Sequence, residues 1–117
     1  MWPEASPLVH IDVAGRQIAR MLSGVTESDF ADDAEKQFAC QYLLVIVGES
    51  VKRLPPDFRA SHPHVLWTEI AGLRDLLVHA YHRISALRIW QICTEDVPVL
   101  LAYIEPLLPP EPSPGSP

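Results

Sequence analysis

The chain has 117 residues, a length that suits one domain and leaves no room for a second. Hydrophobic residues make up 48% of it, which excludes a disordered chain. The net charge is −6, from 9 Lys and Arg against 15 Asp and Glu, and this argues against general affinity for nucleic acids.

The first predicted helix begins after Ser6, a residue type that favours the N-cap, and Pro7 suits the first helical position. Apolar residues then recur at helical spacing, at Ile11, Ala14, Ile18 and Met21. The helix is expected to end near Ser23-Gly24. A polar stretch separates it from the next helix, with Thr26, Ser28 and Asp32 as candidate caps.

The second predicted helix runs from about Asp32 to Leu54 and ends at Pro55-Pro56. Its centre, residues 42–47, is apolar all round, which predicts burial on more than one side. This helix should therefore lie at the centre of a bundle or at a subunit interface. Its aliphatic run, residues 43–47, is far too short to span a membrane, and the N-terminus carries no secretory signal, so we expect a cytoplasmic protein.

The third predicted helix starts between His64 and Trp67 and continues to about Tyr81. Its apolar residues form one narrow stripe with spacings of 4, 3, 4 and 3, at Leu66, Ile70, Leu73, Leu77 and Ala80. This spacing is typical of helices that pack nearly antiparallel.

The fourth predicted helix begins after Ser85, with a kink or break near Thr94 because Pro98 follows. Its apolar face continues through Val97, Leu100, Leu101, Ile104 and Leu108. Residues 106–117 hold six of the twelve prolines. We therefore predict an all-α, up-and-down bundle of four to five helices over residues 1–108, followed by a Pro-rich flexible tail over residues 109–117.

The positive charge is concentrated in one part of the chain. Residues 52–88 contain six basic and three acidic residues, so the net charge of this segment is +3 and that of the rest of the chain is −9. Four of the five histidines also lie there. A local basic surface on an acidic protein fits a confined phosphate site better than a long nucleic-acid track, although chance clustering is an alternative.

Other chemistries have weak signals. Cys40 and Cys93 lack CxxC spacing and are expected to be free thiols in helix cores, with a disulfide or a catalytic thiol as the alternatives. Zinc could in principle be bound by histidines, but no cysteine is near in sequence and acids are sparse, so we predict no metal and no other cofactor. The histidines concerned are His62, His64, His79 and His82.

The most informative segment is residues 74–81, RDLLVHAY, which reads R-x4-H-x-Y. Here the sequence resembles the HepT-like toxins of the HEPN superfamily, which carry this motif near the end of a central helix. Residues 47–54 (VGESVKRL) are similar to the family's Gly-Glu helix, residues 67–74 (WTEIAGLR) to its approach to the motif, and residues 89–98 (IWQICTEDVP) to its final helix. The resemblance covers residues 8–108.

The resemblance implies a homodimer that cuts RNA, mRNA or tRNA, without a metal, with arginines and histidines of both subunits facing one cleft. It implies a toxin of a type II or AMPylation-controlled toxin–antitoxin system. Its partner would be a small nucleotidyltransferase antitoxin that adds AMP to the motif tyrosine, here Tyr81, and silences the toxin. Asp75 stands where the family often has asparagine, and this departure lowers the local positive charge.

The residue types of the motif suit RNA cleavage independently. His79 is a candidate base for a 2′-hydroxyl that attacks the adjacent phosphorus, and Arg74 offers a permanently charged donor fork for the phosphate oxygens. On a regular helix, residues five apart point about 140° away from each other. Either the helix unwinds before His79, or a partner chain completes the site. Tyr81 is seven residues from Arg74 and would share its face, so that an AMP group would lie close to Arg74.

Plainer interpretations remain for each residue. Arg74 could pair with Glu49 across the bundle, and Glu49 would then either orient it or serve structure alone. His79 could be a hydrogen-bonded interface residue, and Tyr81 a packing aromatic. As a whole, the protein could be a non-catalytic HEPN module that binds nucleotides or assembles with a nucleotidyltransferase, or a dimer whose motif is vestigial.

Overall fold

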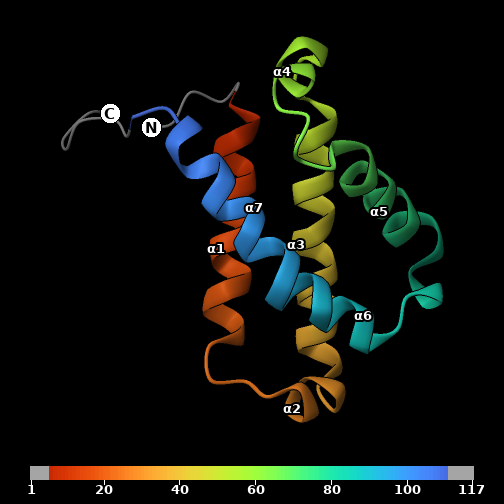
Figure 1. Cartoon of the computed structure of the whole chain (residues 1–117). Helices are drawn as coiled ribbons and strands as arrows, with labels where there is room; N and C mark the ends of the chain where they lie inside the picture. The colour runs from red at the N-terminus through yellow and green to blue at the C-terminus, as the bar shows by residue number, and fades with distance from the viewer. Residues whose placement is uncertain (1–5, 111–117) are drawn as a thin grey trace, which may run out of the picture.

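The computed structural model describes residues 6–110, which form helices joined by short connections and include no strand. Figure 1 shows successive long helices running in opposite directions, so the predicted all-α, up-and-down bundle is confirmed. Residues 1–5 and the predicted tail from residue 111 onward lie outside the described residues. The elements are α1 (Pro7–Leu22), α2 (Glu27–Ala31), α3 (Ala34–Lys52), α4 (Pro56–Ser61), α5 (Trp67–Ala80), a 3₁₀ turn (Tyr81–Arg83), α6 (Ala86–Gln91), a π-helical segment (Ile92–Asp96), α7 (Val97–Ile104) and a second 3₁₀ turn (Glu105–Leu107).

Helix α3 is the central element. It packs against α1 on one side and α5 on the other, while α6 and α7 cross the bundle diagonally (Figure 1). These neighbours bury Leu44 and Val47 of its apolar centre, whereas Tyr42 stays 67% exposed. The hydrophobic core extends along the whole length of α3. Towards α2, the buried residues of this core include Ile18, Phe30, Cys40, Leu44 and Ile89. Towards α4, they include Ile11, Val47, Val51, Trp67 and Ile104.

The start of α3 differs by one residue from the expected cap. Thr26 and Asp29 form a capping box that starts the short helix α2, which hydrophobic periodicity did not reveal. The cap of α3 is then Asp33 and not Asp32, since Asp33 accepts a 3.0 Å hydrogen bond from the backbone N–H of Lys36. This backbone hydrogen bond lowers the pKa of Asp33, so the cap stays ionised at neutral pH.

The start of α5 also differs from the prediction. Pro56 does not only end the preceding helix but begins α4, which the sequence interpretation had missed. Leu66 precedes the first residue of α5 and is 64% exposed, so its place in the predicted apolar stripe is wrong. Trp67 is buried instead, and its indole N–H donates to the carbonyl of His62 at 3.0 Å. This contact ties α4 to the beginning of α5.

Near Thr94, where a kink or break was predicted, the helix widens into a π-helical segment and continues without a break into α7. Ser85 caps α6 as expected, because its side chain accepts from the backbone N–H of Arg88. The Thr94 hydroxyl donates to the carbonyl of Trp90 at 2.7 Å inside the widened turn. Among residues 6–110, no helix is long and apolar enough to cross a bilayer.

Candidate active site

The site is built where α3 and α5 approach most closely. Gly48 of α3 is buried, and a Cβ added to it would collide with the Cβ of Arg74 and lie 3.1 Å from the carbonyl oxygen of Ile70. The two helices therefore meet at a glycine, with little side-chain material between their backbones. Arg74 leaves α5 at this contact, so its first side-chain atoms are fixed by the packing of the two helices.

Two carboxylates surround the Arg74 guanidinium. Its Nε lies 2.6 Å from Oε1 of Glu49, and its Nη1 donates to Oδ1 of Asp75 at 2.9 Å. The Glu49 contact is ionic and does not have hydrogen-bond geometry, because this buried Nε has no hydrogen-bond partner among the described residues. Only 22% of the Arg74 side chain is exposed. The ion pair between Arg74 and Glu49 foreseen from the sequence is thus present.

Lys52 joins this cluster, which the sequence interpretation did not foresee. Its Nζ donates to the same Oδ1 of Asp75 at 2.5 Å. Hydrogen bonds from Lys52 and then from Arg74 hold the pKa of Asp75 below its usual range, so Asp75 is a carboxylate at neutral pH. The sequence does contain one indication that Lys52 lies near Arg74. Lys52 follows Gly48 by four residues, so it lies on the same face of α3 one turn further on.

His79 lies on a different face from Arg74. Helix α5 stays α-helical to Ala80, so the two side chains diverge by about 140° around its axis. The alternative that the helix unwinds before His79 is wrong, because the break comes after it. His79 is exposed, on a stripe that continues at helical spacing through Glu69, Gly72 and Leu76. One chain alone therefore does not bring Arg74 and His79 together.

Tyr81 is placed by the end of the helix. Ala80 has φ −151° and ψ 45°, so the α-helical register stops and Tyr81 opens the 3₁₀ turn. Its ring packs edge-on against Phe38, with 6.4 Å between the ring centroids, and it is 52% exposed. Phe38 lies about 16 Å along α3 from Glu49. Tyr81 and Arg74 therefore both contact α3, at points about three turns apart.

A shallow groove of about 350 Å³ lies beside Tyr81, between α3 and the end of α5. Its lining is mostly apolar, from Phe38, Gln41, Tyr42, Val45, Leu77, Val78 and Tyr81. Phe38 and Tyr42 are more than half exposed. Contiguous apolar patches on a protein surface are typical of contact surfaces.

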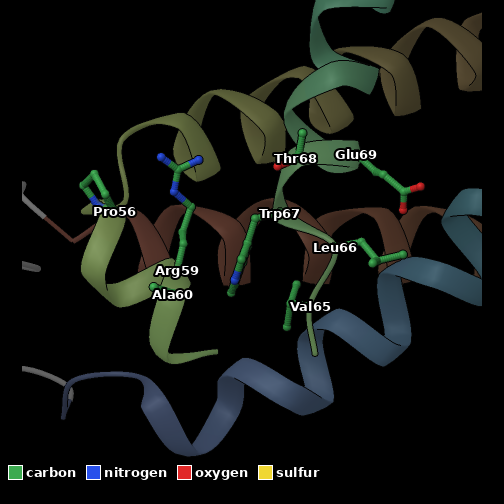
Figure 2. A pocket seen from close by; sticks show the side chains of 8 residues that line it. All are labelled: Pro56, Arg59, Ala60, Val65, Leu66, Trp67, Thr68 and Glu69. Carbon is green, nitrogen blue, oxygen red and sulfur yellow. The ribbon is translucent and has the colours of Figure 1, made fainter. Parts of the chain in front are cut away.

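A second hollow, of about 500 Å³, lies at the other end of α5 (Figure 2). Its lining includes Arg59 of α4 and, from the first turn of α5, Thr68 and Glu69 (Figure 2). Neither Arg74 nor His79 lines this hollow. We therefore place the candidate site at the centre of α5 and not at its beginning.

The zinc and thiol alternatives depend on the histidines and on the two cysteines. In residues 6–110, no three His, Cys, Asp or Glu side chains come together as a metal site, and Nδ1 of His62 is 2.8 Å from the Tyr103 hydroxyl. Cys40 and Cys93 are free and buried, as predicted. The hydrogen bond that Cys93 donates to Cys40, and then burial, raise the pKa of Cys93, while the same hydrogen bond lowers the pKa of Cys40. Both thiols are buried, so neither is accessible to a substrate as a nucleophile.

The chain is similar to known proteins over most of its length. The family model described as "Ribonuclease HepT-like" matches residues 11–107. "Probable ribonuclease HepT" of Thermococcus cleftensis is 40% identical over 79 residues, which cover 68% of this chain and 72% of that protein. A candidate RNase of Caldanaerobacter subterraneus subspecies tengcongensis is 35% identical over 101 residues, 86% of this chain and 90% of that protein. One from Methanocaldococcus jannaschii is 36% identical over 93 residues, 80% and 77% of the two chains. No solved structure matches the chain significantly.

Proposed function

Because the chain belongs to the HepT-like ribonuclease family, we propose that it is a metal-independent endoribonuclease whose active site combines Arg74 and His79 of two copies. The observation that carries this proposal is the divergence of the two side chains on one regular helix. Arg74 is held against α3, while His79 points to solvent, where a second copy could present its own Arg74. A two-fold axis near α5 would pair each histidine with the partner's arginine.

The proposed reaction uses the 2′-hydroxyl of the RNA as the nucleophile. His79 takes the proton from this hydroxyl, whose oxygen then bonds to the adjacent phosphorus. The bond from phosphorus to the 5′ oxygen breaks, which leaves a 2′,3′-cyclic phosphate, and the 5′ oxygen takes up a proton from the solvent. Arg74 remains charged throughout and stabilises the negative charge that develops on the phosphorane oxygens.

The surface around α5 supports pairing of two copies. Leu76 and Val78 of α5 are 38% and 44% exposed, and Phe38 and Tyr42 of α3 are 57% and 67% exposed. In a monomer these side chains would leave apolar area in water, whereas an isologous contact would bury it. Leu76 and Val78 lie within one turn of His79 on α5, so the proposed contact surface and the proposed site adjoin each other.

The test is cleavage of labelled tRNA and mRNA by the purified protein in EDTA, beside Arg74→Ala and His79→Ala. We expect the parent protein to cut and both variants to lose cleavage, because each variant lacks one of the two groups that the reaction needs. Absence of cleavage by a dimeric protein of unmodified mass would contradict the proposal. That result would favour the non-catalytic HEPN module, in which Arg74 serves the ion pairs with Glu49 and Asp75 alone.

We also propose that the protein is the toxin of a toxin–antitoxin pair and that a nucleotidyltransferase antitoxin controls it through Tyr81. The Tyr81 hydroxyl oxygen would attack the α-phosphorus of ATP, pyrophosphate would leave, and the hydroxyl proton would pass to solvent. The exposure of Tyr81 supports access to it. Since Tyr81 and Arg74 contact α3 about three turns apart in one chain, the AMP group would act by covering the apolar groove or the partner's half of the cleft.

Incubation with the antitoxin and ATP is expected to add one AMP per chain and to stop RNA cleavage. Intact mass and a cleavage assay on the same sample measure both effects. Tyr81→Phe should stay unmodified, while Tyr42→Phe is the matched control, because Tyr42 is an exposed tyrosine of the same groove and should not be needed. An unmodified parent protein, or a modified one that still cuts, would show that Tyr81 is not the regulatory residue.

A further inference from the structure

Lys52 lies in the Arg74 cluster but has no part in the reaction proposed above. We propose that Lys52 and Arg74 together bind one backbone phosphate of the RNA, and that the Asp75 carboxylate occupies this two-cation site until the phosphate displaces it. The inference rests on the proposed ribonuclease function. It assigns to Lys52 a binding role and to Asp75 the role of a competing internal anion.

The geometry of the cluster is that of an occupied anion site. Nζ of Lys52 and Nη1 of Arg74 donate to the same oxygen, Oδ1 of Asp75, at 2.5 Å and 2.9 Å. The two donors come from different helices, α3 and α5, and converge on one carboxylate oxygen. Two cations that share one carboxylate oxygen are also close enough to contact one phosphate group, whose oxygens are spaced like those of a carboxylate.

Exposure indicates that Asp75 can leave this position. Half of its side chain and 39% of the Lys52 side chain are exposed, whereas only 22% of Arg74 is. Ion pairs between exposed side chains are worth little, because water screens them and holding two side chains in place costs entropy. An RNA phosphate gains more from the same two cations, since it also releases its condensed counterions. Exchange of the carboxylate for a phosphate is therefore expected.

Glu49 keeps the site in place during this exchange. It contacts Nε of Arg74, on the edge of the guanidinium away from Nη1, and so holds the arginine without occupying the position of Asp75. The protein carries a net charge of −6, so broad electrostatic attraction cannot supply RNA affinity. A pair of fixed cations at the site can supply it locally.

The chain offers a matched control lysine. Lys36 lies on the same helix α3, has 36% of its side chain exposed, and also pairs with one aspartate, Asp33, at 3.5 Å. It belongs to the first turn of α3, whereas Lys52 is the last residue. Removing either lysine deletes one charge and one surface ion pair, and only Lys52 lies beside Arg74.

The experiment measures binding of two fluorescent single-stranded RNAs of different sequence, fully 2′-O-methylated so that the proposed nucleophile is blocked. Anisotropy gives Kd over a range of salt concentrations, and circular dichroism checks folding. We expect Lys52→Ala to weaken binding by about 3- to 10-fold for both sequences and to lower the salt slope by about one, as loss of a phosphate contact does. Lys36→Ala should stay within about twofold of the parent protein, since an exposed ion pair contributes little. Asp75→Asn should bind more tightly, and Lys52→Arg should bind like the parent.

Equal Kd values for Lys52→Ala and Lys36→Ala would overturn the inference, and so would an Asp75→Asn protein that binds as weakly as Lys52→Ala. A parent protein that neither binds these RNAs nor cuts unmodified RNA would overturn the proposed function as well. A parent that binds and cuts, with no distinction between the two lysines, would remove only the role of Lys52.

Discussion

Mixtures of Arg74→Ala and His79→Ala proteins are expected to regain the RNA cleavage that neither variant has alone. Loss of the general base lowers the rate by about 10²- to 10⁴-fold, and loss of the charged donor by about 10²- to 10³-fold. In a hybrid dimer, one chain supplies an intact Arg74 and the other an intact His79. If subunits pair at random, half of the dimers are hybrids and each has one of two sites, so about a quarter of the parent rate should return. Cleavage rates after joint refolding measure the recovery.

A reciprocal mixture separates this arrangement from a site within one chain. Parent protein mixed with a double variant, Arg74→Ala plus His79→Ala, gives hybrids that hold both intact residues on the same chain. A site across the interface leaves these hybrids inactive, whereas a site within one chain makes them active. Recovery in this second mixture but not in the first would contradict the divergence of Arg74 and His79 along α5.

Gly48→Ala is expected to destabilise the protein and to impair the site, although alanine favours helices. Helix propensity alone would stabilise by about 1 kcal/mol. The new Cβ would meet the Cβ of Arg74 and the carbonyl oxygen of Ile70, atoms that cannot move without shifting α5. Overpacking of this kind costs about 1–3 kcal/mol, and we expect it to exceed the gain. Urea denaturation measures stability, and a cleavage assay should show a lower kcat because Arg74 is displaced.

Gly72→Ala is the matched control for this change. Gly72 is the other interior glycine of the α3–α5 pair, and an added Cβ there would meet no atom within 4 Å. This variant should be stabilised by about 1 kcal/mol or less, as propensity predicts. If Gly48→Ala were stabilised by a similar amount, the close contact between α3 and α5 would not exist as described.

Much of the fold was predictable because hydrophobic periodicity reports long amphipathic helices. It identified α1, α3, α5 and the last helical run, and the caps Ser6 and Ser85 gave two of the starts. It missed α2 and α4, which span only five and six residues, too few for a repeat to show. Periodicity wrongly assigned Leu66 to the buried stripe of α5. Spacing shows which residues share a helix face, but it does not show at which residue the helix begins.

Only those features of the site that depend on the geometry of a single helix could be predicted from the sequence. The divergence of Arg74 and His79 is a property of α-helical geometry and could be stated in advance. The contacts of Gly48 and Lys52 depend on the pairing of α3 with α5, which no local pattern specifies. The contact of Tyr81 with Phe38 could not be foreseen for the same reason, and neither could the end of α5 one residue before Tyr81.

The π-helical segment has a consequence for how the chain tolerates changes of length. A π turn holds one residue more than an α turn, so every residue after it is rotated by about 100° relative to an uninterrupted α-helix. With this rotation, Val97 and Ile104 of α7 face the core and are buried. Deletion of a single residue between Ile92 and Asp96 would give a more regular helix and yet turn both side chains away from the core. The irregular segment thus acts as a spacer, and insertions or deletions within it should be tolerated less well than in the connections between helices.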